Sequence, residues 1–226
     1  MNIVHDIEKF ESFVKNLSEE YIYKTFSFSD DTLNNYKEKL DIFIKSNSST
    51  KSSNKEKKES LEHLVSFIAN KTNLFTVHEN VKTSTNEIDL LLTLKKPTGS
   101  IIFEKCILSN DDTVLLECKN YNKKIDVTWI GKFYSLLRTS KTKLGVIFSY
   151  NGFTGEDWKD GTGLAKKIFL TDNTLVLDFS LEDFQEISNG TSILKIIKTK
   201  IQCLKNDTLI HNYISKHPLE GNFQEK

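Results

Sequence analysis

From residue 59 onward the sequence alternates between the patterns of helices and strands, and this order restricts the fold to a mixed α/β domain. A helical stripe comes first, a run of strands follows, and helices then alternate with strands. This order predicts a meander followed by crossover connections. The predicted strands are residues 74–81, 87–94, 101–108, 114–119, 144–150 and 175–179. The predicted helices after the meander are residues 127–138, with Asp126 as N-cap, 156–170 and 193–204.

Residues 1–45 carry apolar side chains at helical spacing, which predicts two helices. Phe26 and Phe28 lie in the break between them, and Asp30 or Asp31 is expected to cap the second helix. The aromatic side chains of this segment have two interpretations. They pack the helices against the core, or they form a dimerisation or target-recognition element. Packing is favoured, because apolar helix stripes usually face a core.

A polar segment separates these helices from the α/β pattern. Residues 45–58 contain no apolar side chain, which is typical of a linker or an exposed loop. We therefore expect an N-terminal helical extension, a polar linker or loop, an α/β domain and a tail. Their predicted bounds are residues 1–45, 46–58, 59–205 and 206–226.

The composition excludes several classes of protein. Of 226 residues, 38% are hydrophobic and 27% charged, which suits a chain with a substantial core and not a collagen-like or disordered one. No apolar run approaches the ~20 residues of a membrane span, and the acidic N-terminus lacks the apolar core of a signal peptide. Three widely spaced cysteines offer neither a zinc site nor a disulfide framework. We expect a cytoplasmic protein.

The charges balance overall but are unevenly distributed. The 31 basic and 31 acidic side chains cancel, so the chain has no globally basic coat for nucleic acid. Residues 119–143, however, contain seven basic side chains and one acid, Asp126. Such a patch can guide a polyanion to one place. A solvated helix face has the same pattern, and charge alone favours that interpretation.

Asp89, Glu117 and Lys119 are charged side chains within apolar strand patterns. Side chains alternate between the two faces of a strand, so Glu117 and Lys119 share a face at a spacing of about 6.6 Å. In its own strand, Asp89 lies on the face opposite that of Ile88 and Leu90. If the two strands pair, Asp89 comes within about 5 Å of Glu117.

Two carboxylates and an ammonium group at the end of apolar strands are costly unless they are paired or bind a metal. Carboxylate oxygens suit Mg²⁺ or Mn²⁺ better than zinc. Such an ion polarises a phosphoryl oxygen and activates water, and Lys119 is placed to orient or deprotonate that water. These are the parts needed to hydrolyse a phosphodiester. The alternative is structural: Glu117 and Lys119 form an ion pair on an edge strand, and Asp89 is simply exposed.

Five sequence blocks follow one another in the α/β part of the chain. They are Leu61-Glu-His-Leu-Val65, Glu87-Ile-Asp89, Glu117-Cys-Lys-Asn-Tyr121, Ile130-Gly-Lys-Phe133 and the stretch 145–154, which ends in Gly-Phe-Thr. Together they resemble the PD-(D/E)XK superfamily and, within it, the Mrr-type domain of type IV restriction endonucleases. The resemblance covers residues 58–180. It implies a restriction-endonuclease-like α/β core, with a mixed central β-sheet flanked by helices and preceded by the N-terminal helical extension.

The resemblance also implies roles for the residues that match the family motif. Asp89 would be the metal-binding aspartate, Glu117 the second metal ligand and Lys119 the catalytic lysine, with Mg²⁺ or Mn²⁺ as the cofactor. The complete motif argues against an inactive copy of the domain.

Three further residues receive roles in the same way. Glu62 would be the helix acid that such domains often turn toward the metal, although a solvent-facing helix residue is an equal alternative. Tyr121 and Lys123 would flank the scissile phosphate.

The sequence departs from the family pattern in three places. Ile88 stands before Asp89, where proline is common in the superfamily, and Ser84-Thr-Asn86 stands where glycines often precede this aspartate. The segment between Asp89 and Glu117 is long, and a strand over residues 101–108 would separate the two motif strands if it were inserted between them. Glu87 or Glu104 would then compete as a metal ligand.

The predicted function is that of a Mg²⁺-dependent DNA endonuclease in restriction or anti-phage defence. The alternatives are a catalytically silent nucleic-acid-binding or assembly subunit, and a DNA repair or junction-resolving nuclease. Cutting both strands of a duplex favours a homodimer, because one chain carries one such site. The short N-terminal region is a poor match to known DNA-reading domains, so a partner subunit for target recognition is also considered.

Overall fold

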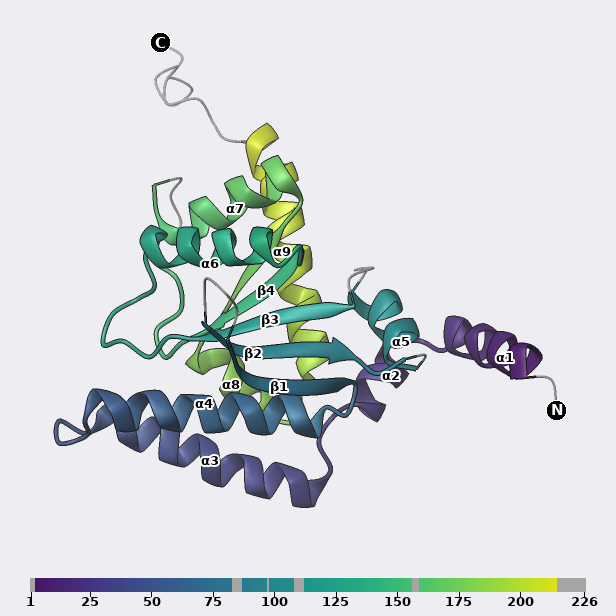
Figure 1. Ribbon diagram of the computed structural model, residues 1–226, viewed down its shortest axis with the longest axis horizontal. Helices are drawn as coiled ribbons and strands as arrows, with labels where there is room; N and C mark the ends of the chain where they lie inside the picture. The colour runs from purple at the N-terminus through teal and green to yellow at the C-terminus, as the bar shows by residue number, and fades with distance from the viewer. Residues whose placement is uncertain (1–2, 83–86, 97, 108–111, 156–158, 215–226) are drawn as a thin grey trace, which may run out of the picture.

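The computed structural model describes residues 3–82, 87–96, 98–107, 112–155 and 159–214, and within them it contains a five-stranded sheet in the order β1-β2-β3-β4-β5. The strands are β1 (Phe75–Lys82), β2 (Glu87–Leu94), β3 (Thr113–Cys118), β4 (Leu144–Phe148) and β5 (Leu175–Phe179). β1, β2 and β3 pair antiparallel, whereas β3, β4 and β5 pair in parallel (Figure 1). The mixed sheet confirms the predicted fold class.

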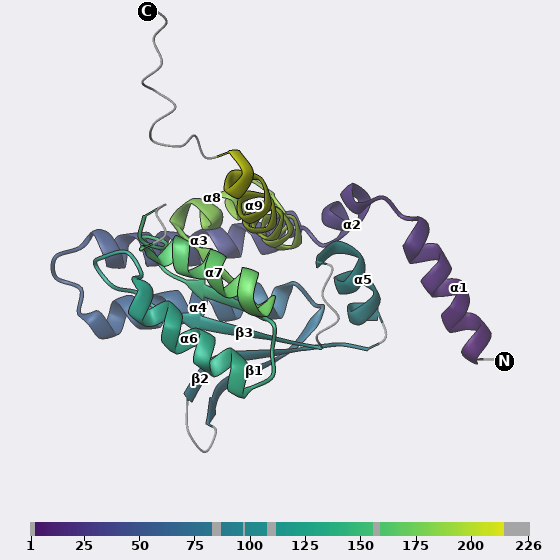
Figure 2. The ribbon, with the colours of Figure 1, turned by 90° about the horizontal axis from the view of Figure 1, so that it is seen from above.

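Helices cover both faces of this sheet (Figures 1 and 2). One face carries α4 (Asn54–Lys71), α8 (Leu181–Ser188) and α9 (Ile193–Ile214), and the other carries α6 (Val127–Thr139) and α7 (Gly161–Asp172). The side chains of β4 show the division, because Val146 and Phe148 join the core of the first face and Ile147 joins that of the second. Among the helices that the structure describes, none combines the length and the apolar character that a membrane span requires.

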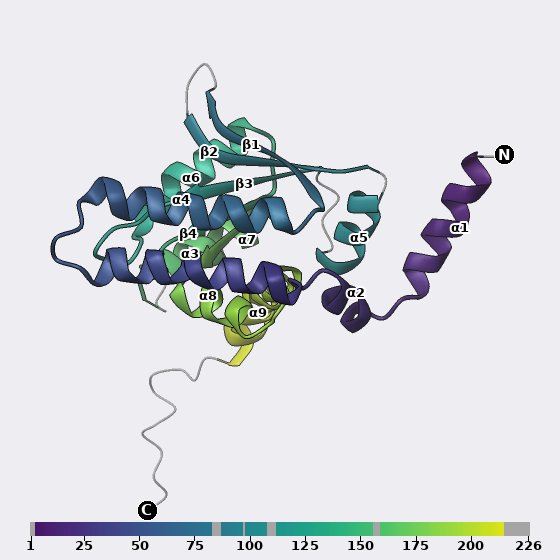
Figure 3. The ribbon, with the colours of Figure 1, turned by 90° about the horizontal axis from the view of Figure 1, so that it is seen from below.

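Three helices precede α4, and each of them contributes side chains to the core of the first face. They are α1 (Ile3–Asn16), α2 (Glu19–Thr25) and α3 (Asp30–Ser48). The hydroxyl of Tyr36 on α3 donates a hydrogen bond to the carbonyl of Phe184 at 2.7 Å, and the ring of Phe43 lies 5.5 Å from that of Phe184. Lys198 of α9 pairs with Glu19 of α2 at 3.5 Å. The packing interpretation is thus confirmed for α2, α3 and the C-terminal end of α1, where Val14 is buried, whereas the rest of α1 extends away from the body (Figure 3).

The polar segment predicted to be a linker or loop over residues 46–58 is mostly helical, so that prediction is wrong. α3 continues to Ser48, and α4 begins at Asn54 after the N-cap Ser53. The side chain of Ser53 accepts from the backbone N–H of Glu56, whose carboxylate accepts from the backbone N–H of Ser53. This capping box starts a helix without any apolar residue in its first turn.

The strand predicted over residues 101–108 is a helix, α5 (Thr98–Ile107), and residue 108 lies outside the described residues. The side chains of Ile102, Phe103, Cys106 and Ile107 are buried, which is the spacing of one helix face. A short apolar run does not distinguish a strand from a buried helix, and this is why the prediction failed.

Smaller corrections concern the ends of the helices. The N-terminal segment forms three helices instead of two, and α3 is capped by Ser29, with Asp30 and Asp31 in its first turn. Helix α8 was not predicted. Helix α7 begins at Gly161, and residues 156–158 of the predicted 156–170 helix lie outside the described residues. Helix α9 continues through residues 206–214 of the predicted tail.

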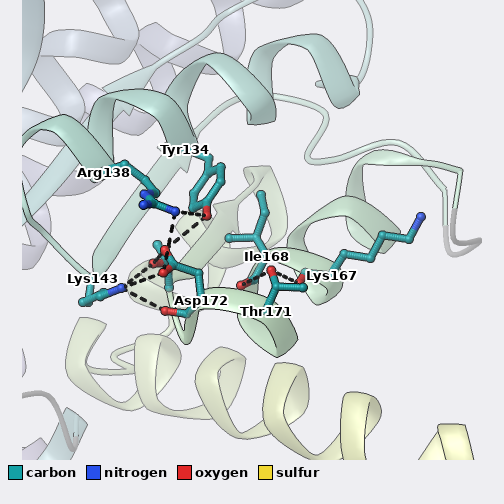
Figure 4. Close-up of polar contacts among 8 residues, drawn as sticks. Tyr134, Arg138, Lys143, Lys167, Ile168, Thr171 and Asp172 are labelled. Atoms are coloured by element: carbon teal, nitrogen blue, oxygen red, sulfur yellow. Dashed lines mark hydrogen bonds and ion pairs between the residues drawn. The ribbon is translucent and has the colours of Figure 1, made fainter.

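A polar network joins α6, α7 and the start of β4 (Figure 4). The carboxylate of Asp172 accepts a hydrogen bond from the hydroxyl of Tyr134 at 3.1 Å and pairs with Lys143 at 3.2 Å. Arg138 lies 3.9 Å from the same carboxylate, and the hydroxyl of Thr174 donates to it at 2.8 Å. One acid thus fastens two helices to each other and to the sheet.

Replacing Phe43 tests whether α3 is part of the core. Phe43→Ala is expected to lower the free energy of unfolding by about 3–5 kcal/mol, because it leaves a cavity beside Phe184. Ile42→Ala on the same helix is the matched control, since the Ile42 side chain is 60% exposed, and it should change stability by less than about 0.5 kcal/mol. Urea unfolding followed by circular dichroism measures both, and equal losses would contradict the packing of α3.

Replacing Asp172 tests the polar network. Hydrogen bonds from Thr174 and Lys143 hold the pKa of Asp172 below its usual value. The carboxylate therefore contributes stability above its unfolded pKa of about 3.9, and this contribution is lost as the pH falls through the lower folded pKa. Asp172→Asn is expected to lower the melting temperature near neutral pH, and the deficit should shrink in acid. Thermal unfolding from neutral pH down to the folded pKa of Asp172 measures the difference in melting temperature between the variant and the wild type. A difference that does not depend on pH would contradict a stabilising role for the Asp172 carboxylate.

Candidate active site

β2 and β3 are direct neighbours, so the strand pairing on which the predicted site depends is present. The register pairs Leu90 with Leu116 and Leu91 with Leu115. The paired register ends one residue before Asp89 and Glu117, and the two carboxylates are close enough for the charge of Asp89 to act on Glu117. Helix α5 lies in the connection between the two strands and not in the sheet, so no inserted strand separates them.

Asp89 fastens the end of β2 to β3. Its Oδ2 accepts a hydrogen bond from the backbone N–H of Cys118 at 2.8 Å. Ile88 packs with the core of the α6 and α7 face, although Leu90 belongs to the opposite core, so the alternation predicted for this strand fails at Ile88. On the neighbouring strand, Asn80 has a left-handed φ of 51°. The regular strand geometry of β1 and β2 is therefore interrupted at Asn80 and Ile88, next to the point where the carboxylate of Asp89 contacts β3.

Glu117 and Lys119 form an ion pair that is mostly shielded from solvent, with 13% and 18% of their side chains exposed. Burial, followed by the charge of Asp89, raises the pKa of Glu117. Burial lowers the pKa of Lys119, but Glu117 outweighs this effect and the pKa of Lys119 is raised. The second oxygen of Glu117, Oε2, is buried and has no hydrogen-bond partner among the described residues. A buried carboxylate oxygen without a partner is costly, and its lone pairs remain available to a cation.

Glu62 lies on the side of α4 that faces these strands. Its carboxylate pairs with Lys58 at 3.1 Å, and its side chain is 29% exposed. This hydrogen bond raises the pKa of Lys58, and the charges of Asp89 and Glu87 add to the effect. Burial, followed by the charges of Asp89 and Glu62, raises the pKa of the Cys118 thiol. The Glu62 carboxylate is thus half-buried and close enough to the end of β3 to act on Cys118.

The loop after β3 is anchored to the first half of α4. The side-chain amide of Asn120 donates to the carbonyl of Lys57 at 2.6 Å, and the ammonium group of Lys57 donates to Oδ1 of Asn122 at 3.0 Å. Lys57 is buried, which is rare for a lysine outside a paired environment. These contacts hold α4, with Glu62 one turn further along, against the strand that carries Glu117.

Of the two residues predicted to flank the phosphate, Tyr121 lies beside the site and Lys123 has a different contact. The ring of Tyr121 stacks on that of Trp129 at 5.3 Å, and the ammonium group of Lys119 lies 5.2 Å from the centre of the Trp129 ring. Lys123 is exposed and pairs with Asp126 at 3.8 Å. Asp126 also caps α6, as predicted, through the backbone N–H groups of the helix start.

A small cavity of about 120 Å³ joins this site to α6. It is lined by Glu87, Glu117, Lys119, Trp129, Lys132, Phe133, Leu136 and Ile147. Trp129 and Lys132 were missed by sequence reasoning, although their spacing of three residues after a helix cap places both on one side of the first turns of α6. Glu87 and Glu104 were considered above as competing metal ligands, and Glu87 lines this cavity. Glu104 is exposed on α5, which follows the opposite end of β2.

The residues present fit a hard divalent cation. Within the described ranges, no three His, Cys, Asp or Glu side chains are arranged as a complete metal cluster. Mg²⁺, however, commonly uses one or two protein carboxylates and completes its shell with water and substrate phosphate. Asp89 and Glu117 supply two such carboxylates. The unpartnered buried Oε2 of Glu117 is the observation that favours a cation here.

The chain has a mixed sheet with helices on both faces, and its motif is Asp89 followed by Glu117-Cys-Lys119. These are the features of PD-(D/E)XK restriction-endonuclease-like nucleases. The family model Mrr_cat, described as restriction endonuclease, matches residues 53–179, more than half of the 226-residue chain. The chain therefore belongs to the Mrr-type restriction endonuclease family, which confirms the resemblance drawn from its motifs. No curated protein and no solved structure matches the chain significantly.

Replacing Asn120 tests the anchor between the loop and α4. Asn120→Ala is expected to lower the free energy of unfolding by about 1 kcal/mol, because it removes the partly buried hydrogen bond from the Asn120 amide to the carbonyl of Lys57, which keeps the hydroxyl of Ser60 as a donor. Asn151→Ala is the matched control, since the Asn151 amide donates to the carbonyl of Tyr121 at 3.2 Å in an exposed setting. Its loss should stay below about 0.5 kcal/mol. Urea unfolding of the two variants compares them, and an equal effect would contradict the anchor.

Proposed function

We propose that this chain is a Mg²⁺- or Mn²⁺-dependent endonuclease that hydrolyses phosphodiester bonds in DNA. The observation that carries the proposal is the meeting of Asp89, Glu117 and Lys119 at one end of the β2–β3 pair, with the buried Oε2 of Glu117 unpartnered. A structural ion pair alone would account for the contact between Glu117 and Lys119. It would not account for a second carboxylate held beside them or for the unpartnered oxygen.

Each side chain has a distinct role in the proposed reaction. Asp89 and Glu117 would hold the ion, which when bound polarises a phosphoryl oxygen and activates water. Lys119 would orient the attacking water and stabilise the negative charge that develops on the phosphate. Glu62, paired with Lys58, would orient the water shell on the side of α4. Tyr121 would border the scissile phosphate, and the exposed Lys123 would contact the DNA backbone further out.

The biological setting is a second part of the proposal. Membership of a restriction endonuclease family favours a role in restriction or anti-phage defence in the cytoplasm. Duplex cleavage favours a homodimer, and the target sequence would be read with a partner subunit. A catalytically silent binding subunit and a junction-resolving nuclease remain the alternatives, and cleavage of plasmid against branched DNA separates them.

Removing the charged groups of the site is expected to abolish cleavage. Asp89→Asn and Lys119→Met should each lower plasmid nicking in Mg²⁺ by at least about 100-fold, because each removes a group that acts on the transition state. Glu104→Gln is the matched control and should keep wild-type activity, since Glu104 is exposed on α5. Nicking of supercoiled plasmid with and without EDTA measures this. An inert wild type on all DNA forms would overturn the proposed activity.

Binding of the metal ion is expected to raise the stability of the fold, which can be measured without any cleavage. Mn²⁺ or Mg²⁺ at about 100 times its dissociation constant should stabilise the wild-type fold by about 2.7 kcal/mol, because the ion binds the native state. Asp89→Asn should lose this gain, whereas Glu104→Gln should retain it. Thermal unfolding over a metal titration is the measurement. A metal-induced shift of equal size in all three proteins would place the ion elsewhere.

A further inference from the structure

The indole ring of Trp129 contacts two ammonium groups. Nζ of Lys119 lies 5.2 Å from its centre and Nζ of Lys132 lies 4.6 Å from it. Both distances are within the ~6 Å over which an aromatic ring attracts a cation. Tyr121 stacks on the same ring with an angle of 30° between the planes, which holds the indole in a defined orientation.

Lys132 lines the cavity that also contains Glu117 and Lys119. It is exposed, and within the part of the chain that the structure describes it forms no salt bridge with a carboxylate. Two ammonium groups gathered on one ring repel each other. An anion placed between them relieves this repulsion, and a phosphodiester group has the charge and the acceptor oxygens to do so.

The Trp129 ring also offers Lys119 a second contact, which matters if a metal ion binds Glu117. In the protein alone, Glu117 holds the ammonium group of Lys119. A carboxylate that turns to a divalent cation is a weaker partner for that lysine, and a lysine side chain is long and flexible. The contact with Trp129 involves no proposed metal ligand, so an ion bound to Glu117 would not compete for it.

We propose that Trp129 is a positioning residue, which holds Lys119 and Lys132 on its ring as a pair, and that Lys132 contacts the phosphate of the bound DNA next to the reacting group. This inference rests on the proposed nuclease function and adds two residues of α6 to the site. Two lysines of the basic patch over residues 119–143 would then act at the reacting phosphate.

The test compares Trp129→Leu with Trp129→Phe, and Lys132→Gln with Ser135→Ala, an exposed control on α6. Trp129→Leu is expected to lower kcat on the order of 100-fold with little change in KM, because a misplaced lysine slows chemistry and not binding. Trp129→Phe should restore most of the rate, since a ring still faces the ammonium group. Lys132→Gln should raise KM and reduce the salt slope of DNA binding by about 1. Wild-type kcat in Trp129→Leu would overturn the positioning role.

A binding experiment keeps the test independent of cleavage. The chain has two tryptophans, so Trp158→Phe leaves Trp129 as its one indole fluorophore. A short DNA duplex in Ca²⁺ should change its emission, and the change should be lost in Lys132→Gln and retained in Ser135→Ala. An emission change that survives Lys132→Gln overturns the phosphate contact. If the wild type does not cleave, the proposed nuclease function fails, and the emission change alone then decides whether Trp129 and Lys132 form a phosphate-binding pair.

Discussion

The pairing of β2 with β3 brings two carboxylates to the same end of two apolar strands, and much of the surrounding structure compensates for that placement. Burial of Glu117 is costly, and repulsion from Asp89 adds to the cost; both raise the pKa of Glu117. The backbone N–H of Cys118 and the ammonium group of Lys119 each offset part of it. Hydrophobic cores on both faces of the sheet hold the strands together against the repulsion.

Each element around the site supplies one supporting group. Helix α4 contributes Glu62 with its partner Lys58, and the contact between Asn120 and Lys57 fixes the distance between that helix and β3. Helix α6 contributes Trp129 at its capped start. The polar network at Asp172 lies at the other end of α6, where β4 begins. Helix α6 is therefore held at both ends, and this is what a ring that positions a lysine requires.

The sequence predicted the elements whose pattern is local, and it missed those that tertiary contacts decide. Strands 87–94 and 175–179 have the predicted bounds, and Asp126 caps α6 as expected, because alternation, apolar runs and capping residues are visible along the chain. Residues 101–108 failed, because a short apolar run fits a buried helix as well as a strand. For Trp129 and Lys132 the sequence indicates only a shared side of α6, since what joins them to Lys119 is the packing of α6 against β3.

Charges of both signs meet at this site, which makes its buried carboxylates tolerable in the free protein. Among the described residues, carboxylates and ammonium groups both lie at or near the start of β2 and the end of β3. The carboxylates are those of Glu62, Glu87, Asp89 and Glu117, and the ammonium groups are those of Lys58, Lys119 and Lys132. Under the proposed function, the carboxylates attract the divalent cation, and the cation and the ammonium groups attract the phosphodiester anion. Each ligand therefore favours the binding of the other.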